Sequence, residues 1–269
     1  GLRPLVSISD HDNIEAPLLL RVLGDARDTP ISVEWTVPWG PTFFHLGVHN
    51  LPPRRALDRM EAMAAFTAAP AAEFLPDILD WLSDDPQTLI VFNHPCWDEK
   101  GIGQETHCRV AHEFLAKFQS YLHAVESNGL RPWTENRKNM ALGVCFGKPS
   151  VSGGDRHTLE PNALLNLTNA RTFGEFVEEV REDGLSHVLV MPQYREPLGV
   201  RVMRGVADVM RDREGDGARA SRWTDRVFMR GEANRPPRAL SEIWTDGDEP
   251  WSVRLFEALV RLSSGRRVQ

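Results

Sequence analysis

Three histidines of this chain each follow a short apolar run, and two of them stand beside acidic residues. His11 lies in the segment SDHD, His94 in FNHP and His157 in SGGDRH. Imidazole and carboxylate groups together are ligands that suit zinc, manganese or iron. Because the three segments are far apart in the sequence, a site built from them must be assembled by the fold. The residue types therefore predict a metal site with nitrogen and oxygen ligands.

Six apolar runs surround these residues and predict buried strands, since they are rich in Val, Ile, Leu and Phe. They are residues 5–9 (LVSIS), 31–37 (ISVEWTV), 42–48 (TFFHLGV), 88–93 (TLIVFN), 122–126 (LHAVE) and 149–154 (PSVSGG). Segments between them suit helices, at residues 54–69, 71–82, 110–118 and 172–181. At the start of the last one, Thr172 and Glu175 have the spacing of a capping box.

This alternation predicts an α/β fold with a mostly parallel sheet wrapped by helices. Either an open doubly wound sheet or a closed TIM-like barrel would satisfy it. Neither G-x-G-x-x-G nor G-x-x-x-x-G-K-[ST] occurs, which weakens the dinucleotide and P-loop alternatives and favours the barrel. In such barrels active-site residues lie at the C-terminal ends of strands. Asp10, His11, His94, Asp155 and His157 all fall at predicted strand ends. Gly153 and Gly154 are expected to let the backbone turn tightly, so that Asp155 and His157 point toward the same site.

Residues 1–200 are predicted to form this domain, and residues 201–269 a C-terminal extension. Within the extension, residues 211–238 are rich in charge and glycine and predict a long loop or linker. Residues 251–262 carry apolar side chains at helical spacing and predict a docking helix.

The composition restricts the partners. Lys and Arg number 31 against 38 Asp and Glu, a net charge of -7, which counts against binding an extended nucleic-acid backbone or an anionic membrane. Cys96, Cys108 and Cys145 contain no C-x-x-C pair, which counts against a disulfide framework and a cysteine-built zinc site. No apolar run approaches the ~18 residues of a membrane span, and no signal peptide opens the chain. A cytoplasmic protein is expected.

The short motifs and their order resemble the PHP (polymerase and histidinol phosphatase) family. SISDHD looks like the family's second motif, VEW like its bridging-glutamate motif, FHLG and FNHP like the next two, and SGGDRH like its G-[ST]-D-x-H motif. The resemblance covers roughly residues 5–195. The family's first motif, H-x-H, has no counterpart here and would lie upstream of Leu5. The resemblance thus implies a distorted (β/α)7 TIM-like barrel that lacks part of its first strand.

The same resemblance implies two or three divalent ions (Zn, Mn or Fe) and hydrolysis of a phosphoester, the substrate being a small phosphorylated metabolite or nucleotide. The ions would activate a bridging water and neutralise the leaving oxygen. Carried over by position, the metal ligands are His11, Glu34, His45, His94, Asp155 and His157. Without the H-x-H motif, one metal position lacks two of its ligands.

Four further residues are predicted to support the reaction. Asp10 or Asp12 is expected to assist catalysis by orienting His11, since ligating histidines commonly need such a partner. Arg131 and Arg195 follow strand-like runs and are expected to bind the substrate, because guanidinium matches phosphate oxygens in bidentate fashion.

Several alternatives stay open. His49 shares a strand face with His45, so spacing cannot separate them as ligands. Glu126 ends a strand run and either faces the site or caps at the surface. Cys96 is interpreted as a small residue packing beneath the site, not as a nucleophile. Two other functions are compatible with the motifs: a nuclease acting on nucleic-acid ends, and a catalytically silent module that binds metal or a ligand, which the missing H-x-H favours.

Overall fold

The computed structural model describes residues 2–156, 162–211, 222–229, 237–245 and 249–264, with side chains up to residue 260. The chain divides into two compact units. The first comprises residues 1–155 and 162–194, and the second comprises residues 156–161 and 195–269. His157 lies outside the described residues.

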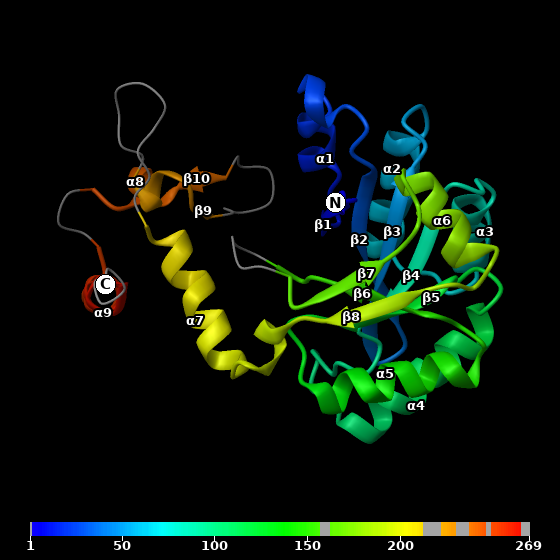
Figure 1. The fold of residues 1–269 in the computed structure, drawn as a ribbon. Coiled ribbons are helices and arrows are strands. Elements are labelled where there is room, and N and C mark those ends of the chain that lie inside the picture. The colour runs from blue at the N-terminus through cyan, green and yellow to red at the C-terminus, as the bar shows by residue number, and fades with distance from the viewer. Residues whose placement is uncertain (1, 157–161, 212–221, 230–236, 246–248, 265–269) are drawn as a thin grey trace. The chain divides into compact units, whose positions relative to one another are not determined.

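The first unit contains a six-stranded sheet whose strands follow one another in chain order (Figure 1). The strands are β1 (Ile8–His11), β2 (Ile31–Trp39), β3 (Thr42–Leu51), β4 (Leu89–Asn93), β5 (Ala124–Asn128) and β6 (Ser150–Gly153). β1 pairs with β2, β4 with β5 and β5 with β6 in parallel, whereas β3 is antiparallel to both β2 and β4. All six predicted strands exist, and the sheet is mixed.

A tight hairpin joins β2 to β3, where the sequence predicted two separate strands of an alternating pattern. Trp39 pairs with Thr42, so only Gly40 and Pro41 form the turn. Gly40 has a φ of 55°, a conformation that glycine adopts without steric cost and that a two-residue hairpin needs at this position. The α/β class is confirmed. A closed (β/α)7 barrel is not seen, because no described residues join β1 to β6 in a ladder.

One face of the sheet packs against helices and forms the larger core. Its buried side chains come from alternate strand positions, among them Trp35, Leu46 and Phe92. The helices that cover this face are α2 (Ala56–Ala68), α3 (Leu75–Ser83) and α4 (Gln104–Phe118), and α5 (Trp133–Cys145) lies at its margin. The indole N–H of Trp35 donates to the carbonyl of Met63 (3.1 Å) and to the hydroxyl of Thr67 (2.9 Å), which satisfies this buried polar group.

The opposite face is apolar over only part of its length. Near one end, Leu89, Val91, Ala124 and Val151 pack beneath α6 (Phe173–Arg181). Thr172 caps this helix by accepting the N–H of Glu175, as its sequence predicted. The Glu175 carboxylate accepts the N–H of Arg171, so the second half of the predicted capping box falls one residue earlier. The rest of this face carries polar side chains.

The remaining elements of the first unit are α1 (Glu15–Leu20), the 3-10 turns η1 (Gly24–Ala26) and η2 (Pro192–Arg195), and a second sheet of β7 (Leu164–Leu167) and β8 (His187–Val190). η2 ends on Arg195, where the second unit begins. The antiparallel β7–β8 pair joins the end of the main sheet through side chains: Asn166 accepts the N–H of Ser152, and Ser186 donates to the carbonyl of Ser150.

The second unit is small and has its own core. Its elements are α7 (Leu198–Val209), η3 (Trp223–Asp225), β9 (Phe228–Met229), β10 (Arg238–Ala239), α8 (Leu240–Ile243) and α9 (Trp251–Ser264). Met210, Trp223 and Val260 are its buried centre. Part of the predicted 211–238 loop lies outside the described residues. None of the helices described in either unit is long and apolar enough to cross a membrane.

Candidate metal centre

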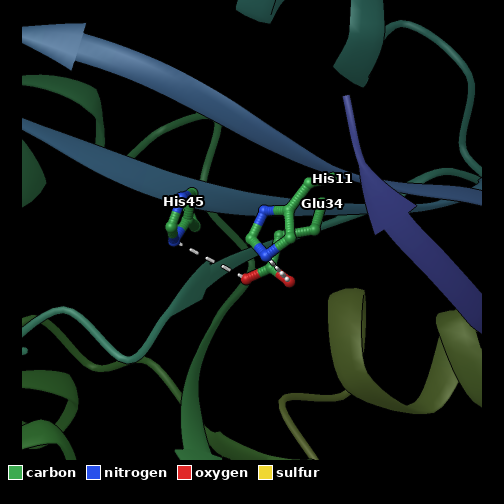
Figure 2. A group of neighbouring side chains, drawn as sticks. All are labelled: His11, Glu34 and His45. Carbon is green, nitrogen blue, oxygen red and sulfur yellow. Dashed lines mark ion pairs between the residues drawn. The ribbon is translucent and has the colours of Figure 1, made fainter. Parts of the chain in front are cut away.

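Glu34 is the centre of a cluster on the polar part of the sheet. In the register of the sheet it lies between His11 of β1 and Gly47 of β3. His11 Nε2 is 3.8 Å from Glu34 Oε2, and His45 Nδ1 is 3.8 Å from Glu34 Oε1. Figure 2 shows both imidazoles turned toward the one carboxylate. A potential ligand atom from each of the three residues lies within 4.8 Å of the others, which is the arrangement expected around a metal ion.

His94 joins the same carboxylate from β4. Its Nε2 lies 3.0 Å from Glu34 Oε1, which also accepts the side-chain N–H of Asn93 at 3.0 Å. His45 pairs with Asn93 across β3 and β4, and its ring contacts the His94 ring edge to face. Four of the six predicted metal ligands are therefore brought together around Glu34.

The electrostatics of the cluster favour a cation. Burial opposes ionisation of Glu34, but hydrogen bonds from His94 and Asn93 outweigh it and lower the pKa to about 2. Burial, reinforced by His94, lowers the pKa of His45 to about 4, so its ring is neutral at pH 7 and keeps a lone pair. Burial alone would lower the pKa of His94, yet its bond to Glu34 and the nearby Glu126 carboxylate raise it. These interactions favour the protonated form of His94, and a metal ion bound beside Glu34 would compete with that proton.

A second group of polar side chains lies beside the first, at the ends of β5 and β6. Glu126 is buried, and burial raises its pKa to about 7. Asn128 donates to Glu126 Oε2 at 3.2 Å and to Asp155 Oδ2 at 3.1 Å. Arg131 lies 3.8 Å from the same Asp155 oxygen, with its guanidinium carbon 3.2 Å from the centre of the Trp97 ring.

The backbone is unusual where three of the strands end. Four non-glycine residues among those described have a positive φ, and three of them lie within two residues of the end of a site strand. They are Asp12 (50°) directly after β1, His94 (27°) directly after β4 and Asp155 (45°) two residues after β6. Such conformations cost free energy and persist where the surrounding structure enforces them, commonly at functional sites.

The remaining predicted residues are placed as follows. Asp12 uses its carboxylate to accept the N–H of Thr36 at 2.7 Å, while its own N–H donates to the carbonyl of Glu34 at 3.0 Å. Asp10 is exposed and, being adjacent to His11 in β1, faces the other side of the sheet. No hydrogen bond joins either aspartate to His11 within the described chain. Arg195 is exposed and belongs to the second unit.

His45 and His49, which spacing alone could not separate, have different partners. His45 faces Glu34, whereas the Nδ1 of His49 is 2.9 Å from the hydroxyl of Ser7, which in turn donates to Ser32. Burial lowers the pKa of His49 to about 4. Cys96 is buried, and its N–H donates to the side chain of Asn139, consistent with a packing residue.

Sequence reasoning missed Asn93 and Asn128 and misjudged Gly153. Both asparagines close buried strand runs, as His94 does, and this shared position was an available signal. Gly153 and Gly154 were expected to turn the chain toward Asp155. Neither has a positive φ, and the turn is made by Asp155 itself. Gly153 is needed instead because a Cβ there would lie 1.4 Å from Glu126 Oε1.

Comparison with known proteins does not assign this chain to a family. No family model matches the chain, so membership of the PHP family stays a prediction, and no curated protein matches it. Among solved structures the chain is similar to an amidohydrolase from Chromobacterium violaceum, with bound sulfate and no metal, at 15% identity and a TM-score of 0.40. The match covers 72% of this chain and 85% of that one. Similarity at this level carries no argument about activity.

Proposed function

We propose that this protein is a metal-dependent hydrolase that cleaves a phosphoester of a small metabolite or nucleotide. One observation carries the proposal: ligand atoms of His11, Glu34 and His45 lie within 4.8 Å of one another, and His94 contacts the same carboxylate at 3.0 Å. Three imidazoles around one partly buried carboxylate are a donor set for Zn, Mn or Fe.

The residues fit such an ion in geometry as well as in type. Metal–ligand distances of about 2.0–2.2 Å place two ligands of one ion about 3–4 Å apart, and the His11, His45 and His94 contacts to Glu34 span 3.0 to 3.8 Å. His11 is 53% exposed and is free to adjust its rotamer.

Each residue has a defined task in the proposed reaction. When bound, a divalent ion supplies Lewis-acid activation of a water and of the substrate oxygen. Glu34 has one oxygen toward His11 and the other toward His45 and His94, and these four residues would hold the metal. Asp155 and His157 are proposed to complete the donor set from β6 and the residues after it.

Arg131 is proposed to bind the phosphoryl group. Its guanidinium lies over Trp97, and its ion-pair partners Asp155 and Glu135 are 3.8 and 4.0 Å away. Its side chain makes no hydrogen bond within the described chain, and an anion would compete with Asp155 and Glu135 for its guanidinium. A guanidinium placed over an aromatic ring can match phosphate oxygens in bidentate fashion, which favours a phosphoester over a neutral amide.

The first test is bound metal. We expect the full chain, purified without chelator, to contain one or more equivalents of Zn, Mn or Fe by elemental analysis. His11→Ala should lower this content, and the matched control His187→Ala, at an exposed histidine of β8, should not. Neither substitution removes a buried side chain, so an altered fold cannot explain a difference. A wild-type protein without metal, and unable to take up added Zn2+ or Mn2+, contradicts the proposal.

The second test is turnover by the metal-loaded protein. We expect hydrolysis of p-nitrophenyl phosphate or of a nucleoside monophosphate, and a lower kcat/KM in Arg131→Ala. Exclusive cleavage of DNA ends would favour the nuclease alternative. Metal binding without turnover of phosphomonoesters, phosphodiesters or a p-nitrophenyl carboxylic ester would favour the catalytically silent module.

A further inference from the structure

Glu126 and Asn128 form a hydrogen-bonded link between two of the predicted metal ligands. Glu126 Oε2 accepts the backbone N–H of His94 at 3.0 Å and the side-chain N–H of Asn128 at 3.2 Å. The same amide nitrogen of Asn128 donates to Asp155 Oδ2 at 3.1 Å. The link runs from the end of β4 through β5 to the end of β6. None of the motifs singled out in the sequence contains either residue.

The surrounding residues hold this link in one arrangement. Asn128 Oδ1 accepts the N–H of Leu130 at 2.8 Å, so its amide nitrogen must face the two carboxylates. Asn136 accepts the backbone N–H of Asn128 and donates to its carbonyl, both at 2.8 Å. On the other side, Gly153 leaves the space that Glu126 Oε1 occupies, since a Cβ there would lie 1.4 Å from it. Because Glu126 is also buried, a substitution at Gly153 must displace it.

The two residues at the ends of the link both have strained backbones. His94 has a φ of 27° and Asp155 a φ of 45°. A positive φ at a non-glycine residue costs free energy, so these turns need interactions that enforce them. The Glu126 bond is made to the His94 backbone, and the Asn128 bond to the Asp155 carboxylate. The link therefore fixes where the His94 imidazole and the Asp155 oxygens lie.

We propose that Glu126 and Asn128 are positioning residues, which act through His94 and Asp155 and contact neither ion nor substrate. The inference rests on the proposed metal site. Asn128 directs donors, not lone pairs, at the site, and its oxygen is already bonded to Leu130. Glu126 Oε2 is occupied by two N–H groups. The link therefore requires that residue 126 supply an acceptor oxygen at the position of Glu126 Oε2.

The test is titration of the full chain with Co2+ alone, followed by the visible absorption of the bound ion, which reports its coordination geometry. We expect Glu126→Leu to bind Co2+ about 10–100-fold more weakly, the usual effect of losing a partner that orients a ligand, and with an altered spectrum. Glu126→Gln retains an acceptor oxygen and should restore both affinity and spectrum to near wild type. Gly153→Ala should resemble Glu126→Leu. Gly24→Ala is the matched control, since a Cβ there has no neighbour within 4 Å.

The outcomes separate this inference from the proposed function. A wild-type protein that binds no Co2+ overturns both. Wild-type affinity and spectrum in Glu126→Leu overturn the positioning role and leave the metal site standing. The positioning role is likewise overturned if Glu126→Gln binds as weakly as Glu126→Leu, because the negative charge and not the acceptor would then matter. Thermal unfolding is measured for each variant, and if Glu126→Leu does not fold, Gly153→Ala against Gly24→Ala decides.

Discussion

Two halves of one sheet face differ sharply although the same strands build both. In one half, Leu89, Val91, Ala124 and Val151 pack beneath α6. Two residues further along, β4 continues with Asn93, β5 with Glu126 and β6 with Gly153. Because side chains alternate across a strand, a step of two residues stays on the same face. The change from an apolar to a polar environment is therefore a change along the strands, not across the sheet.

The difference indicates that the two halves of the face have separate roles. Burying charged groups such as those of Glu34 and Glu126 costs free energy, because their hydration is lost and only partly replaced. The apolar half and the helix-covered face remove hydrocarbon from water and stabilise the strands that hold these groups. The apolar half should thus control stability, and the polar half metal binding. Substitutions in either half can test this separation.

Phe176→Ala should have the largest effect on stability. Phe176 of α6 is 8% exposed and packs on the apolar half. Loss of a buried phenyl ring commonly lowers the free energy of unfolding by about 3–5 kcal/mol. Denaturant unfolding measures the change, with the exposed Phe74 as matched control, since Phe74→Ala should change it by less than about 0.5 kcal/mol. If the Co2+ affinity of folded Phe176→Ala also fell tenfold, the two halves would not be independent.

Glu34→Gln should have the largest effect on metal binding. Glu34 is the one carboxylate that contacts His11, His45 and His94 among the described residues. Replacing an oxygen of a direct ligand by an NH2 group should weaken Zn2+ binding by more than about 100-fold, beyond the 10–100-fold typical of partners outside the ligand set. Competition with a chromophoric chelator measures the affinity. Glu178→Gln, at an exposed position of α6, should match wild type.

His45→Ala and His49→Ala sharpen the comparison within one strand. Both histidines are on the same face of β3, but only His45 faces Glu34, whereas His49 is bonded to Ser7. Because His45→Ala removes a proposed direct ligand, it should weaken Zn2+ binding by about 100-fold, the upper end of the loss typical of partners outside the ligand set. His49→Ala should leave it within about threefold while lowering stability by about 1 kcal/mol, the usual contribution of one hydrogen bond. The same chelator competition and denaturant unfolding measure the two effects, and equal loss of affinity in both variants would refute the assignment.

Local patterns in the sequence were enough to predict the main sheet and the helices α2, α3, α4 and α6 of the first unit, but not α1, α5, β7 or β8. Apolar runs predicted all six strands of the main sheet, and the Thr172 cap predicted the start of α6, because both signals depend on neighbours in the chain. These elements were enough to predict the α/β class. They were not enough to predict how the sheet is arranged, because the antiparallel direction of β3 depends on a two-residue turn at Gly40 and Pro41. The apolar runs on either side do not reveal this turn.

The candidate site could be predicted only for residues that a local sequence motif marks. His11, Glu34, His45 and His94 could be proposed from motifs, and the structure brings them together. The link through Glu126 could not, because its burial depends on the absence of a side chain at Gly153 on another strand. Likewise, His45 and His49 differ only in what the pairing of β2, β3 and β4 places beside them.

The smallest expected effect is a pH dependence at the end of the sheet where β5 begins. His123 precedes β5, its Nδ1 accepts the N–H of Ile90 at 2.9 Å, and burial, with Arg181 and Lys148 nearby, lowers its pKa to about 3. In the unfolded chain its pKa is about 6.5. The contribution of neutral His123 to stability is therefore complete above about pH 6.5 and is lost as the pH falls. The reason is that the unfolded state then binds a proton, whereas the folded state, with its lower pKa, does not. Near pH 5.5 the loss of unfolding free energy should be about 1 kcal/mol.

Denaturant unfolding at pH 7.5 and 5.5 measures this loss, and His123→Asn, which cannot titrate, should show a correspondingly smaller loss. An equal loss in both proteins would mean that other histidines with lowered pKa values, among them His45 and His49, account for the pH dependence.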